Sequence, residues 1–358
     1  MDRVPRFVQT FDAAIRQLQP GLGYWLLRAA CWWMRLPYAL GVWFRNRRYD
    51  RNPNRAVRVP IPVISIGNLT LGGTGKTPAV EFFARYLRSL ERRVAILSRG
   101  YGRDSGPNDE ALLLEENLPD VPHLQGRDRL ELAKTALEEL ESEVLILDDG
   151  FQHRRLHRDF DIVLIDATRD IFAEYLFPRG LLREPMASLK RANAAILTRC
   201  DQAAPESVKQ TLAELERRFP HLLLATARHV PIELIREGHE PTEADSLFGQ
   251  SVAAFCGIGN PDAFRRTLTD LGITVLGFKA FADHHAYTRD DVENLRTWAA
   301  TFPDGTTVVT TQKDWVKLRT PDLAGRALLA VRVGLVFDTG LAELLTRLDS
   351  ILPEPLEE

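Results

Sequence analysis

The feature that most constrains this chain is a glycine-rich run, residues 67–78, which reads Gly-Asn-Leu-Thr-Leu-Gly-Gly-Thr-Gly-Lys-Thr-Pro. It follows the apolar run Val63–Ile66 and precedes a segment with helical spacing of apolar residues. This order is typical of a phosphate-binding loop (P-loop), because glycines let backbone N–H groups and the positive end of a helix point at an anion. The sequence therefore predicts a P-loop NTPase-like α/β fold, with a mainly parallel sheet and helices on both faces.

Within this loop, Lys76 supplies a positive charge for phosphate oxygens, and the Thr77 hydroxyl is a suitable ligand for Mg²⁺. The residues expected to contact the nucleotide are Gly72, Gly73, Thr74, Gly75, Lys76 and Thr77. Two positions depart from known patterns. Thr70 stands where the usual pattern has glycine, and Leu71 stands where a compact Gly-Gly-x-Gly-Lys-Thr variant has lysine. The alternative interpretation is a glycine-rich turn with an incidental lysine. We expect a helix to begin at Pro78.

A second motif, Val144–Asp149, is an apolar strand that ends in two carboxylates. In nucleotide-binding proteins such a strand brings a carboxylate to the metal, so we expect Asp148 and Asp149 to lie near Mg²⁺. The basic segment that follows, residues 150–158, is too polar for a core and is expected to line a site for an anionic ligand.

The N-terminal segment is basic and rich in tryptophan. Residues 1–58 contain eleven arginines against Asp2, Asp12 and Asp50, although the whole chain carries a net charge of −3. Four of the six tryptophans lie between Leu22 and Phe44. This pattern predicts a helix that lies in a membrane interface and is kinked at Pro37. Residues 45–48, Arg-Asn-Arg-Arg, are expected to contact lipid headgroups. The alternative is an ordinary helix packed on the globular part.

We divide the chain into an amphipathic membrane-associating segment (1–54), a nucleotide-binding domain (55–225) and a smaller α/β domain (226–358), with hinge strands near 226–235 and 327–337. Three widely spaced cysteines predict reduced packing residues, with neither a disulfide framework nor a metal site. Two four-residue segments, 198–201 and 311–314, place an Asp three residues after the end of a strand, as in the base-reading motif of GTP-binding proteins.

Five motifs occur in order along the chain: the phosphate-binding loop, Ser-Arg-Gly-Tyr-Gly-Arg (98–103), Asp109-Glu110 before leucines, Asp-Asp-Gly-Phe-Gln-His (148–153) and Asp-His-His-x-Tyr (283–287). Together they resemble the tetraacyldisaccharide 4′-kinase family, the lipid A 4′-kinases of Gram-negative bacteria, over nearly the whole chain. The resemblance implies transfer of the γ-phosphoryl group of ATP to the 4′-hydroxyl of an acylated disaccharide 1-phosphate, giving lipid IVA. It also implies Mg²⁺ as cofactor and a location at the cytoplasmic face of the inner membrane.

The resemblance implies that Asp109 and His284 form a catalytic pair and that Lys76 is also a catalytic residue. Asp109 was expected in the first domain and His284 in the second, so that catalysis would require domain closure. The residues that the resemblance implies for the substrate are Arg99, Arg129, Gln152, His153 and Arg183.

Two other functions are compatible with parts of the sequence. A GTPase switch or metallochaperone would use the base-reading segments, but this chain has Leu71 where such proteins carry their signature lysine. A soluble small-molecule kinase would not need the tryptophan-rich N-terminal segment. We expect no nucleic-acid ligand and infer no obligate protein partner, because aromatic and apolar residues dominate the basic segment.

Overall fold

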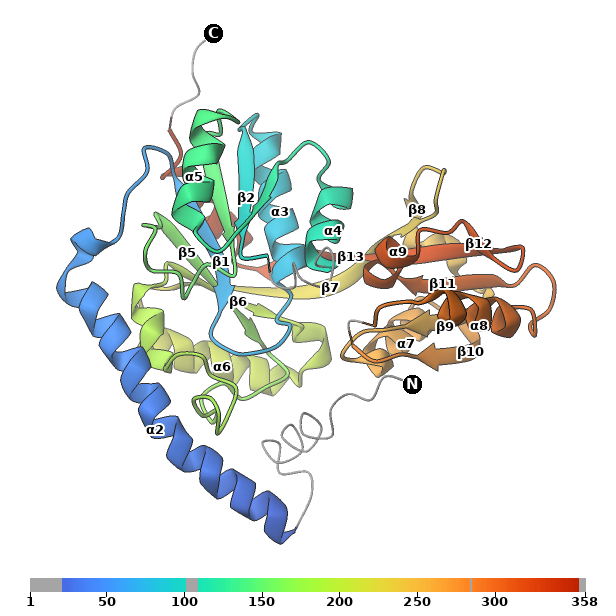
Figure 1. Ribbon diagram of the computed structural model, residues 1–358, viewed down its shortest axis with the longest axis horizontal. Coiled ribbons are helices and arrows are strands. Elements are labelled where there is room, and N and C mark those ends of the chain that lie inside the picture. Colours follow the sequence, from blue (N-terminus) through green and yellow to red (C-terminus); the bar gives the residue numbers. More distant parts are fainter. Residues whose placement is uncertain (1–20, 101–108, 284, 354–358) are drawn as a thin grey trace. The chain divides into compact units, whose positions relative to one another are not determined.

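The computed structural model describes residues 21–100, 109–283 and 285–353 (Figure 1). The expected catalytic residue His284, the first twenty residues and part of the 98–103 motif lie outside the described residues. The chain forms two compact units, which are described separately below. Unit 1 comprises Met1–Gly100, Asp120–Arg228 and Val336–Glu358, and unit 2 comprises Tyr101–Pro119 and His229–Leu335.

Unit 1 contains a parallel sheet in the order β7-β6-β5-β1-β4-β2-β3. Its strands are β1 (Val63–Asn68), β2 (Val94–Ser98), β3 (His123–Gln125), β4 (Val144–Asp148), β5 (Phe160–Asp166), β6 (Ala194–Thr198) and the first part of β7 (Leu223–Ile235). The central strands are almost continuously apolar because both faces of a parallel sheet are covered. Since β1 lies between β4 and β5, the carboxyl ends of β1 and β4 are neighbours, which is where ligands bind in open α/β sheets.

Helices cover both faces of this sheet, as predicted. On one face, Leu145 and Leu147 of β4 pack with Ala133 of α5. On the other, Val163 of β5 packs with Leu215 of α6. The helices of unit 1 are α2 (Leu22–Arg51), α3 (Lys76–Ser89), α5 (Arg129–Glu138), α6 (Pro205–Arg218) and α10 (Leu341–Asp349), with 3₁₀ turns η1 (Pro53–Arg55), η3 (Met186–Arg191) and η4 (Cys200–Gln202).

In unit 2 the strands follow the order β10-β9-β11-β13-β7. Its strands are β9 (Ser251–Cys256), β10 (Thr274–Ala280), β11 (Thr307–Thr311), part of β13 (Arg326–Thr339), the rest of β7, and the short β8 (Thr242–Glu243) and β12 (Asp322–Leu323). Its helices are α4 (Asp109–Asn117), α7 (Pro261–Asp270), α8 (Arg289–Ala299), α9 (Gln312–Leu318) and the 3₁₀ turn η5 (Ala244–Leu247). Alternate residues of β9 face different cores: Cys256 packs with Phe264 of α7, and Phe255 packs with Leu295 of α8.

In two places the units differ from the predicted domains. Helix α4, expected in the nucleotide-binding domain, belongs to unit 2, because Leu112 and Leu113 pack against the core that contains Trp315. The end of β13 and helix α10 return to unit 1, where the ring of Phe337 lies 4.9 Å from that of Phe82. The chain passes between the units within β7 and β13, the segments predicted as hinge strands.

The N-terminal helix α2 is continuous through Pro37 and packs one face on unit 1. Cys31 and Val42 are buried on this face, and the Tyr38 hydroxyl donates a hydrogen bond to the Arg183 carbonyl (3.0 Å). Arg45 forms an ion pair with Glu184, and Asn46 donates to the same carboxylate (2.9 Å). The prediction that residues 45–48 contact lipid headgroups is therefore wrong for Arg45 and Asn46, whose side chains bind the buried carboxylate of Glu184.

Glu184 is completely buried. Burial opposes its ionisation, yet Arg191 and Arg45 outweigh burial and lower the pKa of Glu184 below its usual value. A buried carboxylate with two arginine partners is costly to disrupt, because neutralising it leaves buried cations without a counter-charge.

We therefore expect Glu184→Gln to lower the free energy of unfolding by about 3–5 kcal/mol in urea denaturation at neutral pH. Because the folded-state pKa is depressed, this contribution is present above the unfolded value of about 4.3 and is lost as the pH falls through the folded pKa. The difference between the two proteins should shrink in acid. Glu214→Gln, which removes a carboxylate paired with two arginines on the surface of α6, should change the midpoint little. Equal unfolding midpoints for Glu184→Gln and the unmodified chain would contradict this account.

Candidate functional site

The phosphate-binding loop connects β1 to α3 and is shaped by its own side chains. Gly75, at the N-cap of α3, has a φ of 85°, and Gly72 has a φ of 102°. The buried Asn68 side chain donates to the Gly72 carbonyl (3.3 Å) and to the Thr74 hydroxyl (3.0 Å). Helix α3 begins at Lys76, two residues before the predicted start at Pro78, because the left-handed Gly75 lets the chain turn directly into it. Lys76 and Thr77 therefore lie in the first turn.

A neighbouring loop, residues 181–183, forms backbone hydrogen bonds with the phosphate-binding loop. The Leu71 amide donates to the Leu181 carbonyl (2.7 Å), and the Arg183 amide donates to the Leu69 carbonyl (2.7 Å). Thr70 thus forms an antiparallel bridge with Leu182. Extended, paired backbone does not require glycine, which explains the departures from the usual pattern at positions 70 and 71.

Three charged side chains meet beside the loop. The Asp149 carboxylate accepts hydrogen bonds from Arg183 (2.7 and 2.9 Å), and its Oδ1 lies 3.7 Å from the Lys76 ammonium. Burial opposes the ionisation of Asp149, but Lys76 and Arg183 outweigh it and lower the pKa of this carboxyl. This arrangement fixes a lysine and an arginine at the carboxyl edge of the sheet, where they can bind an anion.

Asp148 and Thr77 are the other predicted metal ligands. Asp148 ends β4 opposite Ile66 of β1 and is 8% exposed, and Thr77 lies in the first turn of α3. Within the described residues, no group of three or more His, Cys, Asp or Glu side chains suits a metal ion. One hydroxyl and two carboxylates nevertheless fit Mg²⁺, which binds one or two protein carboxylates together with phosphate oxygens and water.

The five predicted substrate residues have different environments. Buried Arg129, at the start of α5, is close enough to contribute to the lowered pKa of Asp149. Gln152 braces the loop, since its amide donates to the Asn68 carbonyl (2.9 Å). Burial, with Arg129 and Arg158, lowers the pKa of His153 to about 4, so its imidazole is neutral at neutral pH. Arg183 is described above. Arg99 is exposed and follows β2 at the carboxyl edge of the sheet.

Asp109 begins α4 in unit 2, not in unit 1 as expected. Its Oδ2 lies 2.7 Å from the ammonium of Lys317 on α9. Lys317 belongs to none of the sequence motifs and was not predicted as a site residue. The predicted partner of Asp109, His284, lies outside the described residues. The neighbouring His285 is described, and its carbonyl also accepts a hydrogen bond from Lys317 (3.2 Å).

The two base-reading segments have structural roles. The Thr198 hydroxyl donates to the Thr74 carbonyl (2.9 Å), and Arg199 pairs with Asp166 (2.6 Å). Asp314 is fully buried and accepts from the Gly257 amide and the Tyr287 hydroxyl (2.9 and 3.0 Å). The Asp of the second segment is therefore a structural residue of unit 2, whereas Asp201 of the first segment is exposed.

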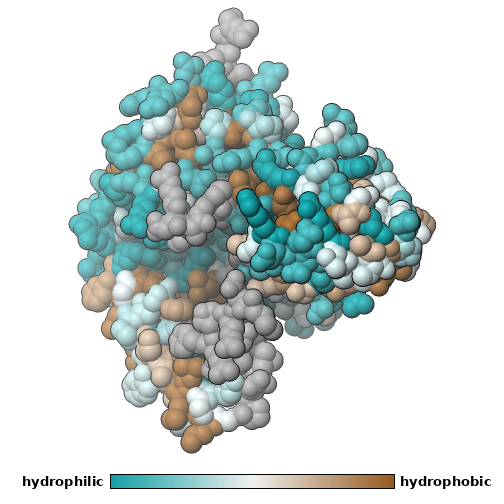
Figure 2. All heavy atoms as spheres, turned by 45° about the vertical axis from the view of Figure 1, so that its right-hand side comes forward, coloured by the Kyte–Doolittle hydropathy of each residue, from teal (hydrophilic) through white to brown (hydrophobic). Residues whose placement is uncertain are grey.

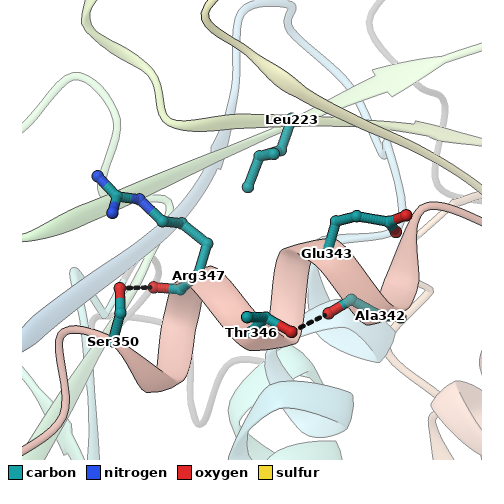
Figure 3. Close-up of a pocket in the computed structure, with 6 residues that line it drawn as sticks. All are labelled: Leu223, Ala342, Glu343, Thr346, Arg347 and Ser350. Atoms are coloured by element: carbon teal, nitrogen blue, oxygen red, sulfur yellow. Dashed lines mark hydrogen bonds between the residues drawn. The ribbon is translucent and has the colours of Figure 1, made fainter.

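A shallow groove lies elsewhere in unit 1, between α10 and Leu223 of β7 (Figure 3). The polar groups of Thr346 and Ser350 bond within the helix, to the carbonyls of Ala342 and Arg347 (2.9 and 2.7 Å). Because the groove contains none of the predicted site residues, it is not part of the phosphate site.

The outer face of α2 is the second functional feature. Figure 2 shows apolar surface gathered at the end of the molecule where the start of α2 lies in Figure 1. Its large apolar side chains that remain exposed are Leu22, Trp25, Leu26, Trp32, Trp33, Met34, Leu36, Leu40, Trp43 and Phe44. In the part of the chain that the structure describes, no helix combines the length and apolar character needed to cross a membrane.

A parallel sheet whose central strand leads through a glycine-rich loop into a helix with Lys and Thr in its first turn defines a protein of the P-loop NTPase-like class. Residues 27–350 match the family model described as Tetraacyldisaccharide-1-P 4′-kinase. The chain therefore belongs to the tetraacyldisaccharide 4′-kinase family, and it is a lipid hydroxyl kinase of lipid A biosynthesis.

Individual relatives agree with the family model. The chain is 40% identical over 309 residues to the tetraacyldisaccharide 4′-kinase of Syntrophus aciditrophicus (strain SB), covering 78% of this chain and 82% of that protein. It is 40% identical over 338 residues to the enzyme of Anaeromyxobacter sp. (strain Fw109-5), covering 88% and 89%. Its fold matches the "apo" form of LpxK from Aquifex aeolicus in complex with ATP, with a TM-score of 0.74, 32% identity, and coverage of 91% and 100%. These findings confirm the resemblance and exclude the switch GTPase and the small-molecule kinase.

Proposed function

We propose that residues 72–77 bind the phosphates of ATP, with Lys76 on the β- and γ-phosphates and the loop amides around them. The support is the meeting of Lys76, Arg183 and Asp149 beside this loop. An added Cβ at Gly72 or Gly73 meets no atom within 4 Å, so the loop faces open space. The homologous LpxK of Aquifex aeolicus was crystallised with ATP. In this proposal the cations neutralise charge on the transferring phosphoryl group.

The same site fits Mg²⁺ through hard oxygen donors: the Thr77 hydroxyl and the carboxylates of Asp148 and Asp149. Both oxygens of Asp149 are within hydrogen-bond distance of Arg183, so Asp148 is the better candidate for direct coordination. When bound, the ion supplies further positive charge at the phosphates. Arg129 and Arg183 add charge of the same sign from the protein.

For the acceptor, we propose that Asp109 takes the proton of the sugar 4′-hydroxyl, with His284 as its partner. A sugar hydroxyl is a weak nucleophile at neutral pH, so a positioned carboxylate assists its attack. In this proposal the phosphate-binding loop lies in unit 1 and the base in unit 2. Gln152, which contacts Asn68, and the residues Arg99 and His153 are proposed to contact the acceptor.

We further propose that the outer face of α2 lies in the surface of the inner membrane at its cytoplasmic side. The exposed tryptophans and leucines supply the apolar contact. Arg48 is exposed at the end of the helix, and Arg47 stacks over Trp43 at 4.9 Å. Such a helix would bring the enzyme to an acylated substrate that itself resides in a membrane.

We expect Lys76→Ala and Thr77→Ala each to lower kcat by at least about 10²–10³-fold, because each removes a contact to phosphate or metal that stabilises the transition state. The assay is ATP-dependent phosphorylation of tetraacyldisaccharide 1-phosphate by the purified chain. Thermal unfolding should be little changed. Lys209→Ala, at an exposed lysine of α6, is the control and should keep full activity. Near-normal turnover of Lys76→Ala would refute the nucleotide assignment.

Asp109→Asn and His284→Ala are each expected to reduce kcat by about 10²–10⁴-fold, the usual contribution of general-base assistance. ATP binding should persist, because Asp109 is not part of the phosphate-binding loop. If the two residues act as one unit, the double variant should lose much less activity than the product of the single losses. Unimpaired kcat in Asp109→Asn would remove Asp109 from the mechanism.

The membrane proposal is tested by substitution and not by deletion of α2. Deletion would also remove Arg45 and Asn46, which bind the buried Glu184. Replacing Trp25, Trp33 and Phe44 together by Ser should weaken co-sedimentation with vesicles of phosphatidylethanolamine and phosphatidylglycerol by at least about tenfold, since each buried aromatic side chain contributes about 1.5–3 kcal/mol. Activity on detergent-dispersed substrate should fall less than activity on vesicles. Phe248→Ser, at an exposed phenylalanine of unit 2, is the control. Unchanged sedimentation of the triple variant would contradict the proposal.

A further inference from the structure

One lysine of α9 contacts both segments that carry the proposed catalytic pair. The Lys317 ammonium lies 2.7 Å from Oδ2 of Asp109 and donates to the carbonyl of His285 at 3.2 Å. The side chains of Lys317 and Asp109 are only 10% and 16% exposed, so water screens their attraction weakly. All three residues belong to unit 2.

The described residues on either side of position 284 in the sequence form contacts within unit 2. His285 contacts Asp291 at 3.0 Å, and Lys313 lies 3.8 Å from Asp283. The Tyr287 hydroxyl donates to Asp314, whose own position at the start of α9 is fixed by the Thr311 hydroxyl (2.6 Å). Three residues of α9, Lys313, Asp314 and Lys317, therefore contact Asp283, Tyr287 and the His285 carbonyl, and Lys317 also contacts Asp109.

We propose that Lys317 is a positioning residue for the phosphoryl transfer: it orients the Asp109 carboxylate, places a positive charge beside it, and binds the carbonyl of His285. The inference rests on the proposed role of Asp109. An ammonium group has three donors and no acceptor, so it can serve a carboxylate and a carbonyl at once. A charge-assisted hydrogen bond of this kind is stronger than a neutral one and restricts the carboxylate to one orientation.

The charges around Asp109 make this role separable from simple packing. Helix α9 packs against α4, and the charge that it brings to Asp109 is that of Lys317. Arg319, at the end of α9, pairs with Glu116 of α4 at 3.2 Å, and Glu110 follows Asp109 on α4 itself. Removing the Lys317 cation therefore favours protonation of the Asp109 carboxylate, whereas breaking the second pair does not.

The test compares Lys317→Gln with Lys317→Arg. Lys317→Gln keeps a donor but loses the charge, and we expect kcat to fall about 10–100-fold, as for a misplaced catalytic group. The KM for ATP should stay near its original value. The acidic limb of the pH profile of kcat should move to higher pH by about one unit or more. Lys317→Arg retains the cation and should return the limb to its original position.

Glu116→Gln is the matched control, because it breaks the other ion pair between the same two helices. It should keep the original kcat and pH profile. A Lys317→Gln enzyme with a reduced kcat but an unmoved acidic limb, and no rescue by Lys317→Arg, would show a merely structural role and overturn the inference. Unreduced kcat in Lys317→Gln would overturn it as well.

A double variant separates this inference from the proposed function. In an Asp109→Asn background, Lys317→Gln should have little further effect, because Lys317 acts through Asp109. If Asp109→Asn itself kept full kcat, the proposed base would be wrong. If Asp109→Asn lost activity while Lys317→Gln did not, only the role of Lys317 would fail. Thermal unfolding of every variant identifies a loss of activity that comes from misfolding.

Discussion

The buried carboxylate of Glu184 must keep its counter-charges, because a charge without a partner in the interior costs several kcal/mol. Arg45 comes from α2 and Arg191 from η3, so one acid joins the N-terminal helix to the sheet of unit 1. The preceding residue, Arg183, contacts Asp149 through its side chain and the phosphate-binding loop through its backbone. Four residues, 181–184, thus connect an exposed apolar helix to the phosphate site.

Much of the fold was predictable from local pattern. Strands buried on both faces are continuous apolar runs, and α6 begins at Pro205 and ends with Arg217 and Arg218, which are favourable residues at these two ends of a helix. Helix α9 was missed for a physical reason. It is short, and two of its buried residues, Gln312 and Asp314, are polar, so its sequence lacks the apolar spacing of a helix. Its tertiary contacts, the hydrogen bond between Gln312 and Asn117 and the burial of Trp315, come from distant parts of the chain, which no local pattern reveals.

The candidate site divides in the same way. Lys76 and Asp149 follow from motifs whose spacing reflects contact with phosphate and metal. Arg183 entered only through the family resemblance, because it lies 34 residues from Asp149, too far for any local pattern to reveal the contact. Lys317 had no signal of either kind. The assignment of α4 to unit 2 likewise depends on packing between segments some two hundred residues apart.

The order of the two units along the chain has a consequence for biosynthesis. Unit 1 is completed by the end of β13 and by α10, where the Tyr86 hydroxyl bonds to Asp349 (2.7 Å). A ribosome makes these segments after the whole of unit 2. The nucleotide-binding unit therefore cannot finish folding while the chain is still being synthesised, and unit 2 must form as an insertion within an incomplete partner. Loss of α10 would for this reason damage the unit that contains the phosphate-binding loop.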